Sequence, residues 1–158
     1  MGARTRTSIG VISDTHGLVR PQALAALRGS DLIVHAGDVG HPAVLEALGA
    51  LAPLVAVRGN NDRGAWAEGL ATTEVLEVAG VSLYLLHDLG ELPVDPAQAG
   101  FHAVISGHSH RPKLEWRGGV LYLNPGSAGP RRFKLPVSLA RVCVHAGGIE
   151  AELVELAV

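Results

Sequence analysis

Five short apolar runs, each followed at once by polar side chains, restrict most strongly how this chain folds. The runs lie at residues 9–12, 32–34, 54–57, 83–86 and 103–105, and they are separated by glycine and proline. Short, β-branched runs bounded in this way are typical of buried strands. The polar side chains that follow them are Asp14 and His16, Asp38, Asn60, His87, and His108 and His110.

The first three predicted strands alternate with predicted helices. Pro21 begins one helix at a first-turn position and Gly29 ends it, while Pro42 begins a second helix that runs to about Leu51. This order predicts parallel strands joined by right-handed crossovers. Because the carboxyl ends of parallel strands lie at one edge, where open α/β sheets bind ligands, we expect the polar side chains after these strands to meet there.

The second half of the chain has a different pattern. Residues 62–72 read as a loop, residues 73–78 and 81–86 as a hairpin, and residues 102–105 as a strand after a short helix that Asp95 and Pro96 begin. Three further strands, at 120–123, 137–144 and 149–156, have no helix between them. We therefore expect them to pair antiparallel in a second sheet, with the two sheets packed face to face and helices outside.

Composition limits the class of protein. A chain of 158 residues is expected to form one domain, residues 1–158. A net charge of -2 gives no broad basic surface for a nucleic-acid duplex or an anionic membrane. The lone Cys143 permits no intramolecular disulfide, and the chain shows neither an apolar leader nor a run long enough to span a membrane. We expect a cytoplasmic protein.

The spacing of the candidate ligands predicts two neighbouring metal ions. His108 and His110 are two residues apart beyond a strand, as are Asp14 and His16. Either pair alone is a weak signal. The joint order Asp-x-His, Gly-Asp, Gly-Asn-x-Asp, His and Gly-His-x-His, each after a strand, is far more specific and predicts a binuclear centre. Nitrogen and oxygen donors without a thiolate suit Mn²⁺, Fe, Zn²⁺ or Ni²⁺.

These motifs resemble those of the calcineurin-like metallophosphoesterases. The chain length and Asn124-Pro125-Gly126-Ser127 resemble the small single-domain phosphodiesterase branch of bacteria and archaea. The resemblance implies an α/β fold, a four-layer αββα sandwich of two mixed β-sheets flanked by helices. It also implies that Asp38 bridges two metals, one held with Asp14, His16 and His110, and the other with Asn60, His87 and His108.

Such a centre implies phosphoryl chemistry. Two carboxylates against two divalent cations leave a charge of about +2, which attracts phosphate. Metals roughly 3.5–4 Å apart can hold a hydroxide and neutralise phosphoryl oxygens during in-line attack. We expect a metal-dependent phosphodiesterase, with Mn²⁺ as the first choice of metal, that hydrolyses small, nucleotide-like phosphodiesters through a metal-bridging hydroxide. Asn60 is expected to ligate through oxygen and to direct its amide hydrogens at the phosphate.

Four other positions have open roles. Asn61 stands where many relatives have a His that resembles a general acid, which argues against a generic alkyl phosphomonoesterase. Asp62 either positions water or assists proton transfer, as a catalytic residue, or orients His16. Asp88 replaces a usual Gly and either adds charge near the second metal or points away. Arg131 either contacts substrate phosphate or is solvated.

Other hypotheses remain open at this point. The same fold is found in a branch that resembles a retromer subunit, so a protein-interaction scaffold is an alternative, as is a phosphomonoesterase or protein phosphatase. A homo-oligomer is possible. His35 is expected to pack or hydrogen-bond below the site, and Asn124 to fix a tight turn before Pro125, with a place in the cleft left open.

Overall fold

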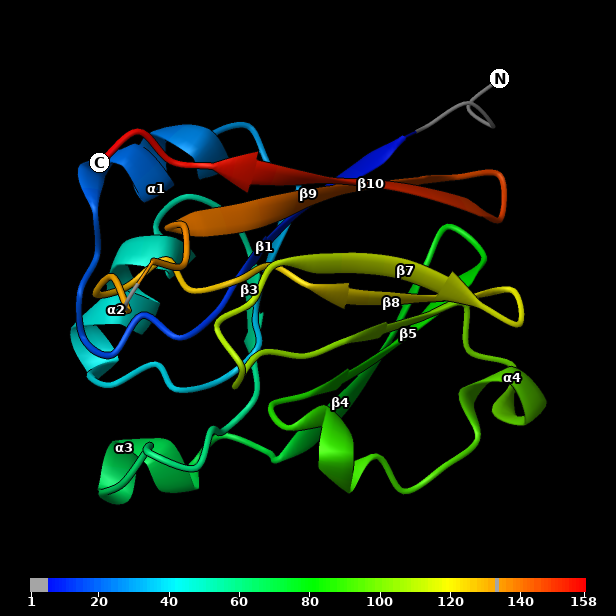
Figure 1. Ribbon diagram of the computed structural model, residues 1–158, viewed down its shortest axis with the longest axis horizontal. Helices are drawn as coiled ribbons and strands as arrows, with labels where there is room; N and C mark the ends of the chain where they lie inside the picture. Colours follow the sequence, from blue (N-terminus) through cyan, green and yellow to red (C-terminus); the bar gives the residue numbers. More distant parts are fainter. Residues whose placement is uncertain (1–5, 133) are drawn as a thin grey trace.

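A computed structural model of the protein describes residues 6–132 and 134–158, which form two five-stranded sheets packed face to face (Figure 1). The strands are β1 (Thr7–Ile12), β2 (Leu32–His35), β3 (Leu54–Ala56), β4 (Thr73–Val78), β5 (Val81–Leu86), β6 (Ala103–Ile105), β7 (Lys113–Arg117), β8 (Val120–Asn124), β9 (Ser138–His145) and β10 (Gly148–Glu155). The helices are α1 (Pro21–Leu27), α2 (Pro42–Gly49), α3 (Ala65–Glu68), the 3₁₀ turn η2 (Leu89–Glu91) and α4 (Pro96–Ala99). The predicted sandwich of two mixed sheets is confirmed.

The first sheet has the order β10-β9-β1-β2-β3. Its strands β1, β2 and β3 are parallel, as the alternation of strands and helices predicts. The prediction that β9 and β10 belong to a second sheet is wrong, because β9 pairs antiparallel with β1 and β10 with β9. The physical reason is that the free edge of β1 carries backbone groups that need partners, and β9 supplies them.

The second sheet has the order β4-β5-β6-β8-β7. The predicted β4–β5 hairpin is present, and β6 lies parallel to both β5 and β8. Strand β7, which sequence analysis did not predict, pairs antiparallel with β8 at the edge. It contains no apolar run, because it alternates Lys113, Glu115 and Arg117 with Leu114 and Trp116, as edge strands often do.

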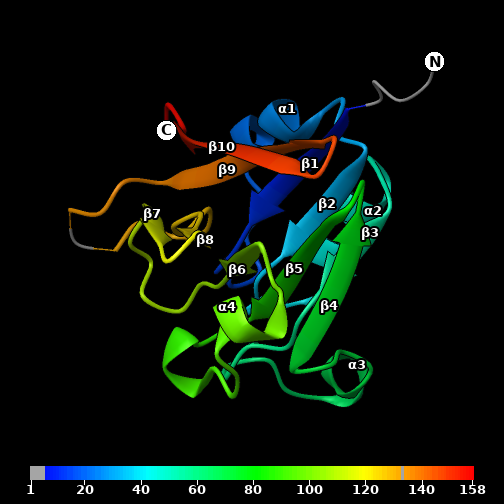
Figure 2. The same ribbon diagram turned by 90° about the vertical axis from the view of Figure 1, so that its right-hand side faces the viewer.

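The helices cover the two sheets unequally. Apolar side chains from both sheets fill the space between them. On the outer face of the first sheet, Ala23 and Leu27 of α1 and Val44 and Leu48 of α2 are buried. Among the described residues, the outer face of the second sheet is covered by the segment from η2 to Phe101, which includes α4 (Figure 2). The segment 62–72, predicted as loop, contains the single turn α3. None of the described helices is both long and apolar enough to cross a membrane.

Candidate metal centre

Backbone hydrogen bonds beyond the strand ends place Asp14 beside Asp38. After β1 and β2 end, the N–H of Asp14 donates to Gly37 O (3.0 Å) and the N–H of His16 donates to Asp38 O (3.0 Å). The exit loops of the two parallel strands therefore run together. The N–H of Ala36 donates to Ile12 O at the point where both strands end. The two carboxylates meet at the sheet edge where the strand order predicts them.

Five of the seven predicted metal ligands form two compact groups. One consists of Asp14, His16 and His110, and the other of Asp14, Asp38 and His87; in each, the candidate ligand atoms lie within 4.8 Å of one another. Asp14 Oδ1 lies 3.4 Å from His110 Nε2 and 3.8 Å from His87 Nε2. Asp38 Oδ2 lies 3.8 Å from His16 Nε2 and 3.2 Å from His87 Nε2. Each carboxylate thus reaches imidazoles of both predicted metal sets.

Four buried side-chain atoms at this centre have no hydrogen-bond partner within the described part of the chain. They are Asp14 Oδ1, His16 Nε2, His87 Nε2 and His110 Nδ1. A buried polar atom without a partner costs about 1–3 kcal/mol, so several together call for a ligand. Carboxylate oxygen and imidazole nitrogen are donors that divalent transition metals prefer. The residues present therefore fit a metal centre.

Hydrogen bonds hold the other side-chain polar atoms of Asp14 and His87 in place. Asp14 Oδ2 accepts hydrogen bonds from Ser13 Oγ (2.6 Å) and from the N–H of His108 (3.1 Å). His87 Nδ1 lies 2.7 Å from Ala36 O and, since a carbonyl only accepts, it donates its proton there. Its Nε2 is thereby left with a lone pair that faces the carboxylates. Such outer contacts fix the tautomer and the orientation of a metal-binding imidazole.

The backbone at the centre is strained. Seven non-glycine residues among those described have positive φ, and the five that are predicted ligands are Asp14 (54°), His16 (47°), Asp38 (56°), His108 (71°) and His110 (63°). A left-handed conformation costs an ordinary residue roughly 1–2 kcal/mol. Strain of this kind persists where the surrounding structure imposes it, and it gathers at functional sites.

His108 and Asn60 lie at the margin of the centre. Both are exposed, and the His108 ring packs edge-on against that of His87, with 5.2 Å between centroids. The neighbour Asn61 contributes a contact that sequence analysis missed. Its backbone N–H donates to Asp38 Oδ1 (2.9 Å) and its side-chain amide to Asp38 Oδ2 (3.0 Å). The Gly-Asn-x-Asp motif could have indicated this contact, because Asn61 is its third residue and lies between two predicted site residues.

Asp62 has a role that differs from both sequence-based hypotheses. Its buried carboxylate accepts hydrogen bonds from the N–H groups of Val39 (3.2 Å), Gly40 (2.9 Å) and Gly59 (2.9 Å). None of its hydrogen bonds among the described residues goes to His16. Asp62 therefore ties the loop after β2 to the loop after β3. With its oxygens engaged in this way, it is placed to hold the backbone rather than to move a proton.

The two carboxylates at the centre are ionised at neutral pH. Burial raises the pKa of Asp38, but the adjacent His87 imidazole and the hydrogen bonds from Asn61 outweigh burial and hold that pKa below its usual range. For Asp14 too, burial raises the pKa, but the nearby His110, the hydrogen bond from Ser13 and the nearby His87 outweigh burial and lower that pKa below its usual value. Burial lowers the pKa of His87, but the adjacent carboxylates raise it above its usual value.

The chain matches, from residue 8 to residue 147, the family model described as the calcineurin-like phosphoesterase superfamily domain. It belongs to this superfamily. A probable metallophosphoesterase from Methanocaldococcus jannaschii is 34% identical over 161 residues, which cover 94% of this chain and 81% of the relative. The resemblance in the motifs is thus confirmed, and the chain is a member of a family of metal-dependent phosphoesterases.

Solved structures share the fold of this phosphoesterase chain. A structure described as a novel archaeal phosphodiesterase has a TM-score of 0.78 at 20% identity and covers 94% of this chain and 100% of its own. Vps29 of Chaetomium thermophilum also has a TM-score of 0.78, at 18% identity, over 96% of this chain and 100% of its own. Identities this low show the shared fold alone.

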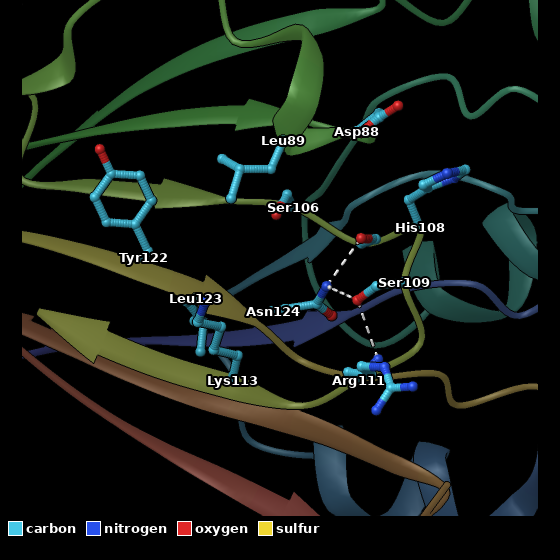
Figure 3. Close-up of a pocket in the computed structure, with 11 residues that line it drawn as sticks. Asp88, Leu89, Ser106, His108, Ser109, Arg111, Lys113, Tyr122, Leu123 and Asn124 are labelled. Atoms are coloured by element: carbon cyan, nitrogen blue, oxygen red, sulfur yellow. Dashed lines mark hydrogen bonds between the residues drawn. The ribbon is translucent and has the colours of Figure 1, made fainter.

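Two cavities flank His108 in this phosphoesterase domain, and His108 and Asp88 line both. The larger cavity, of about 610 Å³, is also lined by Asn60, Arg63 and His87. The smaller, of about 250 Å³, extends over the second sheet (Figure 3). Arg131, the predicted substrate contact, is exposed and lines neither of these two cavities.

Asn124 has both of the roles left open for it. Its Oδ1 accepts from the N–H of Gly126 (2.9 Å), which fixes the turn at Pro125. Its Nδ2 donates to Gly107 O (2.8 Å) and to Ser109 Oγ (3.1 Å), and the residue lines the smaller cavity (Figure 3). Asn124 therefore joins the turn after β8 to the loop that carries the two histidines of the Gly-His-x-His motif.

Proposed function

We propose that the protein is a phosphodiesterase that hydrolyses small, nucleotide-like phosphodiesters at a binuclear metal centre. The observation that carries the proposal is the set of four buried side-chain atoms, on Asp14, His16, His87 and His110, that have no hydrogen-bond partner among the described residues. The first metal would be held by Asp14, His16, Asp38 and His110, and the second by Asp38, Asn60, His87 and His108.

The metals and the chain would contribute different parts of the chemistry. Two divalent cations, Mn²⁺ or else Fe, Zn²⁺ or Ni²⁺, would supply Lewis-acid polarisation of the phosphoryl group and a nucleophile derived from water at neutral pH. The amide and backbone N–H of Asn61 hold the Asp38 carboxylate in position. Exposed at the larger cavity, the Asn60 amide is available to donate to a phosphoryl oxygen.

Asn61 also bears on the choice between diesters and monoesters. An amide cannot protonate a leaving alkoxide, and its nitrogen already donates to Asp38. Alkyl phosphomonoesters need such protonation most, because their leaving group is strongly basic. Asn61 therefore argues against a generic alkyl phosphomonoesterase, and among phosphodiesters it favours those whose leaving group needs no proton.

Hydrolysis of a matched pair of esters tests the proposal. Protein stripped with a chelator is assayed on bis(p-nitrophenyl) phosphate and p-nitrophenyl phosphate, before and after Mn²⁺ is added. We expect Mn²⁺ to restore turnover of the diester in preference to the monoester, Asp38→Ala to abolish it, and the exposed Trp116→Ala control to retain it. Preference for the monoester would replace the diesterase with a phosphomonoesterase. Metal binding without cleavage of either ester, with Mn²⁺, Ni²⁺ and Zn²⁺ all tried, would favour the interaction scaffold.

A further inference from the structure

The smaller cavity lies on the outer face of the second sheet, where the covering layer is thin. Because side chains alternate along a strand, Tyr122 and Asn124 of β8 share one face. In the antiparallel register of β7 and β8, Glu115 is opposite Tyr122 and Lys113 is opposite Asn124. Tyr122 packs with the apolar cluster on this outer face, which the segment from η2 to Phe101 covers. A hollow therefore remains between η2 and β7.

Asp88 and Leu89 build one wall of this cavity. The Asp88 carboxylate accepts a hydrogen bond from the N–H of Gly90 (3.0 Å) and so caps η2. The residue after Asp88, Leu89, packs onto the outer cluster with Tyr84 and Tyr122. The capping residue thereby sets an apolar wall beside the metal centre.

Tyr122 forms the far end of the cavity. The Arg117 guanidinium lies 4.1 Å from the centroid of its ring, a cation–π contact that holds the ring. In the view of Figure 3, Leu89 and Ser106 lie between Tyr122 and His108. The cavity thus leads from a predicted metal ligand along an apolar wall to an aromatic ring. The cationic residues Arg111 and Lys113 also line the cavity.

We propose that this cavity binds a ring-bearing substituent of the phosphodiester, of the nucleoside class, with Leu89 and Tyr122 as the residues that select it. The proposal rests on the proposed function and adds a subsite to it. Pockets for drug-sized ligands start at about 300 Å³. One ring system with its sugar is smaller than such a ligand, so a volume of about 250 Å³ suits it. The larger cavity, on the other side of His108, receives the second substituent, which a monoester lacks.

Binding of two phosphate monoesters tests the subsite independently of turnover. The dissociation constants of thymidine monophosphate and methyl phosphate, which differ only in the ring-bearing group, are measured by calorimetry on the Mn²⁺-loaded protein. We expect thymidine monophosphate to bind about tenfold more tightly, since contact of a base with an aromatic side chain stabilises the bound nucleotide. Tyr122→Ala and Leu89→Ala should each remove most of this preference, and Tyr122→Phe and Trp116→Ala should retain it.

The outcomes separate the subsite from the proposed activity. Equal binding of the two monoesters to the unaltered protein overturns the subsite, as does a preference that survives both Tyr122→Ala and Leu89→Ala. A ring preference that these variants abolish, in a protein that cleaves no diester, would overturn the proposed function and leave a nucleotide-binding site. Because Leu89 lies in a surface turn, Leu89→Ala keeps the test decisive even if Tyr122→Ala fails to fold.

Discussion

His110 holds a left-handed backbone conformation, with a φ of 63°, in a position where its ring reaches Asp14. Positive φ is also found at four other predicted ligands, Asp14, His16, Asp38 and His108. The strand-exit loops impose these conformations and offset their cost. In this way the side chains of Asp14, His16, Asp38 and His110 are brought close together. The left-handed backbone conformation of each residue thus orients its side chain, and the same conformation lowers the free energy of unfolding.

Replacing His110 by glycine or by alanine measures this cost. Both variants lose the imidazole, but only glycine adopts positive φ without strain, so we expect the metal-free His110→Gly protein to be about 0.5–1 kcal/mol more stable than His110→Ala. Urea unfolding gives both values. The neighbour Ser109, which is not among the positive-φ residues, is the control, and there the glycine variant should be no more stable than the alanine variant. Equal stabilities at position 110 would show that the backbone is not strained.

His35 is a buried imidazole whose hydrogen bonds fix it as neutral. Thr15 Oγ1 donates to Val39 O (2.8 Å), so it accepts from His35 Nε2 (3.0 Å), and His35 Nδ1 accepts from the N–H of Gly37 (3.1 Å). The expectation that His35 hydrogen-bonds below the site is confirmed. Burial lowers its pKa to about 4 from 6.5, against the opposing effect of nearby carboxylates.

This lowered pKa predicts acid sensitivity. Between pH 6.5 and about 4 the unfolded chain binds a proton at His35 that the folded chain does not, so this contribution to stability is complete above pH 6.5 and is lost as the pH falls. The slope due to this residue approaches about 1.4 kcal/mol per pH unit. Urea unfolding of metal-free protein should show that His35→Asn, which keeps an acceptor for Gly37, has a flatter profile in this range. Parallel profiles would contradict the assignment.

At the scale of elements, the exit loops of β2 and β3 are joined by one carboxylate. Asp62 accepts three backbone N–H groups, from Val39, Gly40 and Gly59. In Asp62→Ala these donors lose a buried charged acceptor, and we expect the free energy of unfolding to fall by about 3 kcal/mol and Mn²⁺ affinity to fall with it. Asp62→Asn, which keeps one acceptor oxygen, should lie between.

A matched control for Asp62 is Asp95, another carboxylate that accepts backbone N–H groups. Asp95 caps α4 through Ala97 and Gln98. Asp95→Ala should cost about 1 kcal/mol and leave Mn²⁺ affinity unchanged. Denaturant unfolding and calorimetric titration with Mn²⁺ measure both quantities for each variant. If Asp62→Ala and Asp95→Ala behave alike, the loops of the centre do not depend on Asp62.

Elements were predictable from the sequence where local patterns decide them. Parallel pairing of β1, β2 and β3 and the β4–β5 hairpin follow from helix signals and from Ala79-Gly80. Strand β7 was missed because its alternation of charged and apolar residues is not an apolar run. The sheet to which β9 and β10 belong is decided by which distant edge they complete, and no local pattern encodes that choice. The contacts of Asp62 and Asn61 were likewise hidden, because they depend on how two loops lie together.

At the scale of the whole molecule, the centre lies where the two sheets meet. Asp14, His16 and Asp38 follow strands of the first sheet, while His87 and His110 follow strands of the second. Their side chains approach one another within 3.2–3.9 Å. A cation bound there would link the sheets, so its binding free energy would add directly to the stability of the sandwich.

Metal binding should therefore stabilise the entire fold. At a free Mn²⁺ concentration 100 times the dissociation constant, we expect a gain of about 2.7 kcal/mol over the chelator-treated protein, because the unfolded chain has no assembled site. Asp38→Ala, from the first sheet, and His87→Ala, from the second, should each remove most of the gain, whereas His145→Ala, outside the ligand set, should keep it. Urea unfolding with and without Mn²⁺ gives these differences. A gain of equal size in Asp38→Ala and in the unaltered protein would place the metal elsewhere, and a gain lost only in first-sheet variants would mean that the cation does not join the two sheets.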